Sequence, residues 1–250
     1  MSQAAVARRV PLAVPVAIAV AWAVSITANA VGRTDLLSHD AIAGGALPLP
    51  VGVVAFAVAW TVMVAAMMLP STIPMVRLFA GASAAQPDHS RVMTAFVGGY
   101  VALWALFGVG ALAFDLGVHA AVDALPWLEE RSFLLGAGVL ALAGAFQFTD
   151  LKDRCLDQCR HPAAFLIPRY RRGVAAAWSL GTDHGLFCMG CCWALMLLMF
   201  SAGVTDLRWM AALTLLMAYE KLGRHGVAVG RAAGVVLLGA AVVVLGVGLS

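Results

Sequence analysis

Long apolar segments alternate with short polar stretches along the whole chain. A helix needs about 20 mostly apolar residues to cross a hydrocarbon core of about 30 Å, and most of these segments approach that length. The segments are residues 10–31, 51–79, 93–114, 132–148, 174–200, 209–219 and 227–249. The pattern predicts an all-α, polytopic integral membrane helical bundle of about seven transmembrane helices, or six if segment 209–219 does not cross. Because no repeat or linker divides the pattern, residues 1–250 are expected to form a single transmembrane helical domain.

The composition excludes a soluble fold. Hydrophobic residues make up 62% of the 250 residues, charged residues make up 12%, and the mean hydropathy is +0.92. Soluble domains contain about 45–50% apolar and about 25% charged residues. The net charge of +3 is small, and the sequence has no basic helix, zinc finger or aromatic RNA-binding motif. The lipid bilayer is therefore an expected partner, and nucleic acid is not.

Lysine and arginine fall unequally on the two sides of this topology, and basic loops are retained on the cytoplasmic side of a membrane. One side carries Arg8, Arg9, Arg77, Arg91, Lys152, Arg154, Arg160, Arg169, Arg171, Arg172, Lys221, Arg224 and Arg231. The other side carries Arg33, Arg131 and Arg208. The distribution predicts a cytoplasmic N-terminus. The first segment is longer than the apolar part of a signal peptide, about 7–15 residues, so we expect a retained helix, although cleavage stays open.

Prolines and one pair of charges interrupt the apolar segments. Proline supplies no backbone N–H and clashes with the preceding turn, so Pro70 and Pro74 are expected to break segment 51–79 near its cytoplasmic end. Glu220 and Lys221 follow the short segment 209–219 and would lie within the membrane if that helix continues. Buried ionisable groups need partners, so we expect these two to pair with each other or with backbone carbonyls. A solvated helix end explains them almost as well.

The most informative stretch is 181–193, which holds a histidine and three cysteines. Positions three and four apart share a helix face, so His184, Cys188, Cys191 and Cys192 form a ladder, with Asp183 beside it. Thiolates and imidazole are soft ligands that favour copper(I), while zinc and iron stay open. We therefore predict a metal site here. In the alternative interpretation, the cysteines are small hydrophobes that only pack between helices.

A second group of cysteines, Cys155 and Cys159, follows the fourth segment on the predicted cytoplasmic side. They lie one helical turn apart and are expected to chelate one ion, with His161 or Asp157 completing the ligand set. A reducing compartment forbids a stable disulfide, so free structural thiols are an equal alternative. Methionines recur on the second, fifth and sixth segments, and a thioether such as Met67 is a candidate copper(I) ligand. Glu220 is a further candidate metal ligand. Core packing by methionine is the alternative.

Several uncommon motifs carry a family resemblance. They are Trp60-Thr-Val-Met-Val-Ala-Ala-Met-Met-Leu-Pro-Ser71, Gln147 with Lys152-Asp-Arg-Cys-Leu-Asp-Gln-Cys-Arg-His-Pro162, Cys188-Met-Gly-Cys-Cys-Trp-Ala-Leu-Met196, and Trp209-Met with Glu220-Lys221. Through them the chain resembles, over about residues 50–225, a bacterial family of unknown function described as predicted metal-binding integral membrane proteins. The resemblance implies metal binding by the cysteine motifs and a multi-pass protein of the bacterial inner (cytoplasmic) membrane.

Three functions follow from these residues. The first is a copper-handling membrane protein that passes copper(I) to or from a partner protein. The second is a membrane metal-dependent oxidoreductase or monooxygenase, or a subunit of one, in which the same residues hold a catalytic metal with an open position. The third is a noncatalytic structural membrane subunit. An oligomeric assembly is compatible with all three.

Overall fold

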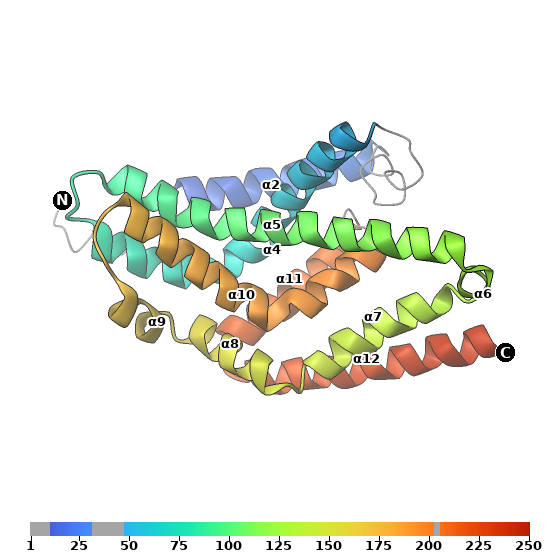
Figure 1. Ribbon diagram of the computed structural model, residues 1–250. Helices are drawn as coiled ribbons and strands as arrows, with labels where there is room; N and C mark the ends of the chain where they lie inside the picture. The colour runs from blue at the N-terminus through green and yellow to red at the C-terminus, as the bar shows by residue number, and fades with distance from the viewer. Residues whose placement is uncertain (1–10, 32–47, 203–205) are drawn as a thin grey trace.

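A computed structural model describes residues 11–31, 48–202 and 206–250, and every regular element in these ranges is a helix (Figure 1). The helices are α2 (Ala13–Ala30), α4 (Leu49–Ser83), α5 (His89–Ala124), α6 (Pro126–Glu129), α7 (Phe133–Phe146), α8 (Asp150–Arg160), α9 (Pro162–Arg169), α10 (Val174–Ala202), α11 (Leu207–Leu222) and α12 (Gly226–Leu249). The all-α class predicted from the sequence is confirmed.

Within the described ranges, five helices are long and apolar enough to cross a membrane: α2, α4, α5, most of α10, and α12. A sixth crossing is counted if α7 and α8, which meet at a bend of 63°, form one broken span. The segment predicted at 209–219 is α11, whose 16 residues extend about 24 Å, less than a hydrocarbon core of about 30 Å. The described part of the chain therefore holds five or six candidate crossings, fewer than the seven expected. Arg8, Arg9 and Arg33, which helped to predict the orientation, lie outside the described residues.

Glycines let the long helices approach one another closely. Along the pair formed by α5 and α10, a Cβ atom at Gly181 would overlap the backbone carbonyl of Phe96, and one at Gly99 would overlap that of Trp178. The same kind of contact joins α7 to α12, since a Cβ at Gly144 would lie 2.9 Å from the carbonyl oxygen of Gly234. Small residues at such crossings allow backbone contact where lipid removes the hydrophobic drive for helix association. In Figure 1 the α7–α12 pair lies beside the main bundle, and α8 leads from one to the other.

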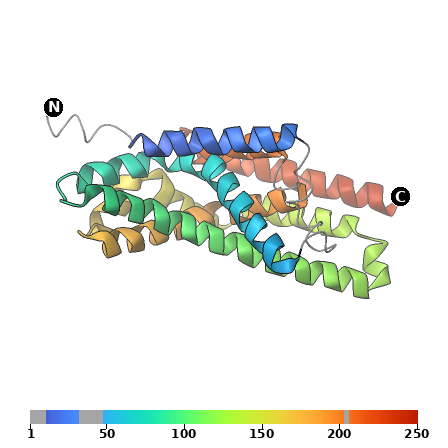
Figure 2. The same cartoon turned by 90° about the horizontal axis from the view of Figure 1, so that it is seen from above.

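The prediction that Pro70 and Pro74 break their helix is wrong. α4 continues through both prolines to Ser83 and bends without ending (Figure 2). A proline at position 70 removes the hydrogen bond to the carbonyl of Ala66, and the indole Nε1 of Trp22 on α2 donates to that oxygen at 3.0 Å. A side chain from a neighbouring helix thus satisfies the carbonyl that the proline frees, as an apolar environment requires.

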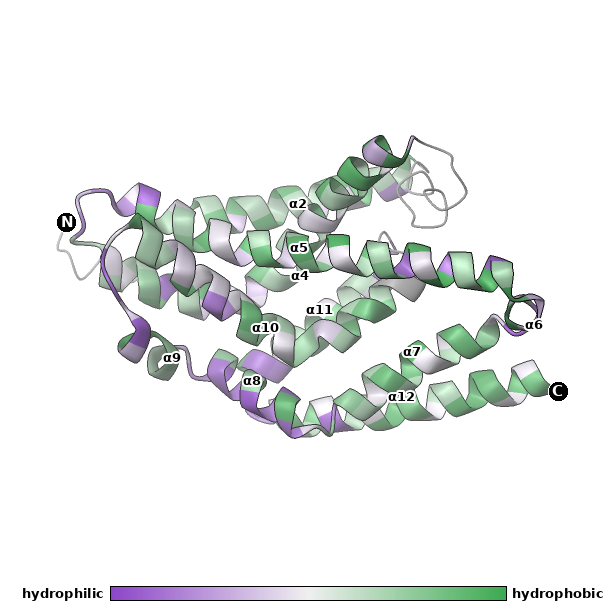
Figure 3. Ribbon diagram, in the orientation of Figure 1, coloured by the Kyte–Doolittle hydropathy of each residue, from purple (hydrophilic) through white to green (hydrophobic). Residues whose placement is uncertain are grey.

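Polar residues gather where α8 crosses beneath the bundle. Figure 3 shows α8 as hydrophilic along most of its length, whereas α7 and α12 beside it are hydrophobic. One face of α8 is nevertheless buried, through Lys152, Cys155 and Leu156. This buried face packs on α10 and brings the second cysteine group toward the first.

We expect Gly181→Ala to destabilise the protein by about 1–3 kcal/mol, because the added methyl group overpacks the contact between α5 and α10. The thermal unfolding midpoint of the detergent-solubilised protein measures this loss. Gly110→Ala on α5 is the matched control, since a Cβ at Gly110 meets nothing within 4 Å. Equal midpoints for the two variants would contradict the role given to Gly181.

Candidate metal site

The three cysteines of α10 are buried in the centre of the helix bundle. Cys188, Cys191 and Cys192 are each at most 1% exposed. The thiols of Cys191 and Cys192 donate to the carbonyl oxygen of Cys188 at 3.0 and 2.9 Å. The Cys188 thiol instead faces neighbouring helices, with Tyr100 Oη at 3.1 Å and Lys221 Nζ at 3.1 Å. The sulfur atoms therefore point into the protein interior.

The two cysteine groups, which are far apart in the sequence, meet where α8 crosses α10. Cys155 packs directly on the backbone of Gly190. A Cβ added at Gly190 would lie 2.6 Å from the Sγ of Cys155. Cys159 lies one turn further along α8 and is half-buried. All five cysteines are free. The structure thus collects every thiol of the chain into one region.

Lys221 is the charged group of this region. Its side chain is 5% exposed, and its ammonium group donates to Cys188 Sγ at 3.1 Å and to Ser71 Oγ at 3.2 Å. Burying an ammonium group is costly unless a partner compensates its charge. The thiols are the groups that face it from α10, and the hydroxyl of Ser71 faces it from α4.

Glu220 and Lys221 do not pair with each other, so that prediction is wrong. Glu220 Oε1 accepts from Lys152 Nζ at 2.8 Å, and Lys152 also donates to Gln147 Oε1. The backbone carbonyl of Glu220 accepts from Arg160. Consecutive residues point about 100° apart on a helix. Glu220 therefore faces α8 while Lys221 faces the cysteines.

A thioether and a phenol complete the surroundings of the thiols. Met68 Sδ lies 3.9 Å from Cys192 Sγ, and Tyr100 Oη accepts from Thr72 Oγ1 at 3.2 Å. Met67, the methionine singled out from the sequence, is fully buried in the same hydrophobic cluster, but Met68 is the one beside a cysteine.

His184 lies one turn before Cys188 and is 4% exposed. Its ring stacks on Tyr100 at 5.7 Å between centroids and meets the ring of Phe165 edge-on at 5.4 Å. Within the described part of the chain, its Nδ1 is buried and has no hydrogen-bond partner. An imidazole with an unused nitrogen beside the thiols is chemically suited to bind a soft ion.

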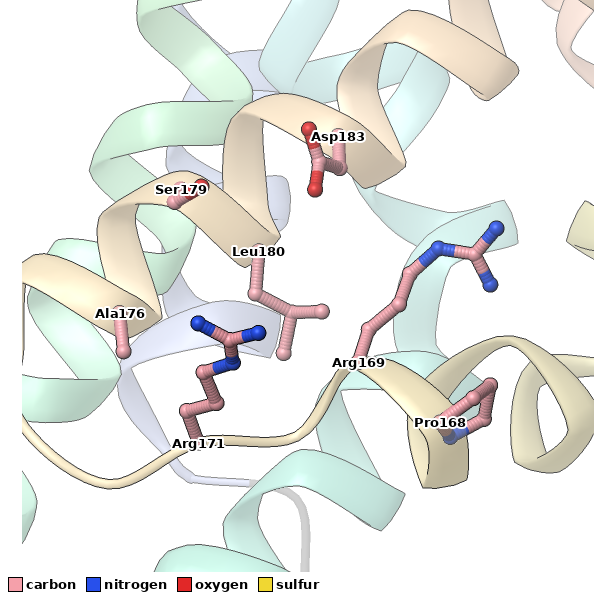
Figure 4. A pocket seen from close by; sticks show the side chains of 7 residues that line it. All are labelled: Pro168, Arg169, Arg171, Ala176, Ser179, Leu180 and Asp183. Carbon is pink, nitrogen blue, oxygen red and sulfur yellow. The ribbon is translucent and has the colours of Figure 1, made fainter.

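Three other residues singled out from the sequence lie away from the cysteines. Asp183 is exposed and lines a surface pocket of about 410 Å³ together with Arg169 and Arg171 (Figure 4). His161 ends α8 with its side chain 62% exposed, and its Nδ1 lies 3.0 Å from Asp157 Oδ1. Glu220 is occupied by Lys152, as described above.

In the described ranges, no three His, Cys, Asp or Glu side chains stand in an arrangement that holds an ion. Cys191 and Cys192 both donate to the carbonyl of Cys188, which turns their thiols onto their own helix. Binding of an ion by these two residues requires their side chains to rotate away from that carbonyl.

Sequence reasoning missed the groups around the thiols: Tyr100 and Lys221 contact Cys188, Ser71 contacts Lys221, and Met68 contacts Cys192. Lys221 and Ser71 belong to the motifs that carry the family resemblance. Their place in those motifs was the sequence feature that could have pointed to them. Tyr100 stands in an apolar segment with no motif around it, so nothing in the sequence distinguished it. Met68 is the sequence neighbour of Met67, the methionine predicted as a ligand. The rotation of α4 determines which of the two side chains lies beside Cys192.

Taken together, the fold and the thiol cluster define an all-helical protein with membrane-length helices around buried soft ligands. The chain matches the model of the PpoB2 family, described as copper chaperone, over residues 57–244, and it belongs to that family. Both cysteine groups, Met68 and Lys221 lie inside the matched region. This copper-related description agrees with the metal binding that the motif resemblance implies. No curated protein and no solved structure matches the chain.

We expect Glu220→Gln to lower the free energy of unfolding by about 3–5 kcal/mol, because it leaves the Lys152 ammonium buried without its counter-charge. Thermal or denaturant unfolding of the solubilised protein measures the change. Replacing the pair together, as Lys152→Met with Glu220→Leu, removes both charges and should recover most of the loss. A double variant as unstable as the single one would show that the pair is not what Glu220 contributes.

Proposed function

We propose that this chain is an integral membrane protein that binds copper(I) through its buried cysteine cluster and exchanges it with a partner protein. The observation that carries the proposal is that Cys155 on α8 packs on Gly190 of α10, between Cys188 and Cys191, while Lys221 Nζ lies 3.1 Å from Cys188 Sγ. Membership of a copper chaperone family supports it, because a chaperone holds its ion between a donor and an acceptor. Five helices of membrane length in the described ranges support the bilayer as its surroundings.

The choice of copper(I) rests on the chemistry of the donor set. Thiolates and thioethers are soft ligands that favour copper(I) over harder divalent ions. The polar groups that contact Cys188 Sγ from other helices are the phenol of Tyr100 and the ammonium group of Lys221. The carboxylate of Glu220 is paired with Lys152. Structural zinc sites, by contrast, take four ligands in a tetrahedral arrangement.

Charge balance favours a monovalent ion as well. Copper(I) with two thiolates carries one net negative charge, which the ammonium group of Lys221 neutralises. A divalent ion with the same two thiolates would leave the region with a net positive charge, which is costly in an apolar interior. Lys221 thus acts as the counter-charge of the loaded cluster and disfavours zinc.

One specific observation favours a second candidate, a subunit in which the cysteines only pack. Cys191 and Cys192 are hydrogen-bonded to the backbone and fill space in the core, as small hydrophobes do. The two candidates differ in what a serine substitution changes. Loss of copper with retained folding favours the chaperone, and loss of stability without any copper bound favours the packing role.

We expect Cys159→Ser and Cys188→Ser each to weaken copper(I) binding strongly, because they remove soft ligands from the two groups of the cluster. Competition with a chromophoric copper(I) chelator, under reducing conditions and in detergent, measures the affinity of each variant. His161→Ala is the matched control, since this exposed residue shares the motif of Cys159 but pairs with Asp157. Unchanged copper stoichiometry in the variant that carries serine at positions 188, 191 and 192 would refute the proposal.

We expect Lys221→Met to weaken copper(I) binding by about 10–100-fold, the usual cost of losing a group that supports the ligands. The same substitution should weaken zinc binding less, because it removes a positive charge from a region that a divalent ion makes more positive. Lys221→Arg keeps the charge and should keep the preference for copper(I). Equal losses for the two metals in Lys221→Met would contradict the role of counter-charge.

A further inference from the structure

Methionine sulfurs are concentrated on one side of the cysteine cluster. Of the 11 methionines in the chain, the seven that belong to the buried core around the cysteines are each at most 2% exposed. They are Met63, Met67 and Met68 on α4, Met196 and Met199 on α10, and Met210 and Met217 on α11. Met75 and Met93 pack in a separate cluster with Phe79 and Phe96, on the other side of the cysteines.

The contacts at the cysteines fix how the three helices run past one another. Ser71 lies level with Cys188 and Lys221, and Met68 lies level with Cys192, so α4 descends as α10 ascends. α11 starts shortly after α10 ends and brings Lys221 back to Cys188, so it too runs opposite to α10 (Figure 1).

This register stacks the methionines in successive levels. One turn beyond the cysteines, α10 presents Met196, and a further turn brings Met199. Met67 and then Met63 ascend in the same direction on α4, as do Met217 and then Met210 on α11. At about 1.5 Å per residue the levels reach about 10–16 Å from the cysteines, a third to a half of a hydrocarbon core of about 30 Å.

An aromatic layer closes the far end of these levels. Trp60, one turn beyond Met63, donates through Nε1 to the carbonyl of Trp104 at 2.8 Å, and Phe56 stacks on it at 5.9 Å. All three side chains are 0% exposed. The thioethers therefore form a column bounded by thiols at one end and by tryptophans at the other.

We propose that the seven methionines form a relay for copper(I), along which the ion moves between the cysteine cluster and the aromatic layer formed by Phe56, Trp60 and Trp104. The proposal rests on the proposed function, since the cysteines supply the ion. Thioethers are soft but neutral, so they hold copper(I) more weakly than thiolates and let it move from one sulfur to the next. The oxidation state does not change along the relay, and no proton is exchanged with a thioether.

Methionine is also an ordinary core residue, and what distinguishes the relay is its position. Met75 and Met93 are also buried in the bundle, with exposures of 1% and 7%, but belong to a separate cluster. If the methionines only fill space, a soft ion should affect all of these methionines equally. If they form a relay, only the seven in the column respond to it.

The first test follows the methionine methyl groups by NMR in the detergent-solubilised full chain labelled with [methyl-¹³C]methionine. Silver(I), a redox-stable substitute for copper(I), is added in increments. We expect the signals of the seven column methionines to shift after the cysteines are filled, and those of Met75 and Met93 to stay in place. Shifts of Met75 and Met93 equal to those of the column, or no shift in the column, would overturn the relay.

The second test measures transfer in vesicles. The chain is reconstituted into liposomes that enclose a fluorescent chelator, and silver(I) is added outside. A variant with Met63, Met199 and Met210 all changed to leucine should move silver(I) at least about tenfold more slowly, since leucine keeps the volume but is no ligand. The control with Met75 and Met93 changed to leucine should keep the wild-type rate. Equal rates in the two variants would overturn the relay.

Chelator competition on the same preparations separates the two proposals. If the cysteines bind the ion with wild-type affinity but the transfer rate does not depend on the column methionines, the relay alone is overturned. Absence of copper(I) binding in the wild-type protein overturns the relay and the proposed function together. Melting temperatures of both leucine variants, expected to stay close to wild type, show that any loss of transfer is not a loss of folding.

Discussion

A buried ammonium group is the constraint around which this bundle is arranged. Lys221 lies in an apolar interior and has to meet partners there, because an uncompensated charge would cost several kcal/mol. Its partners come from two other helices, Ser71 on α4 and Cys188 on α10. The same contacts that compensate the charge therefore fix the relative heights of α4, α10 and α11. The heights of the methionine and cysteine side chains on these three helices follow from those contacts.

A second buried ammonium group, that of Lys152, links the outer helices to α11. Lys152 on α8 reaches Glu220 on α11 and Gln147 at the end of α7. α12 fits closely over this group, because a Cβ at Gly230 would lie 2.6 Å from Glu220 Oε1. This polar group holds the bend between α7 and α8 in place, and with it the face of α8 that carries Cys155 and Cys159. The thiol cluster is thus supported from both sides of α11.

The sequence revealed the class of protein because length and apolarity are the properties that a bilayer selects. It also located both cysteine groups, since their spacing is readable on a helix. It could not show that the groups meet, because their meeting depends on the bend after Phe146 and on the missing side chain of Gly190, neither of which alters hydrophobic periodicity. For the same reason Asp183 was taken as a neighbour of the thiols, although the rotation of α10 turns it outward to the arginines.

The adjacency of Glu220 and Lys221 has a consequence for motion within the bundle. Turning α11 about its long axis by one residue would set a carboxylate against the thiol of Cys188 and remove the counter-charge from Lys152. Both exchanges are unfavourable, so these contacts oppose rotation of α11 about its axis. Any rearrangement at the thiols is therefore left to α8 and to the cysteine side chains, whose hydrogen bonds to the backbone contribute little to stability.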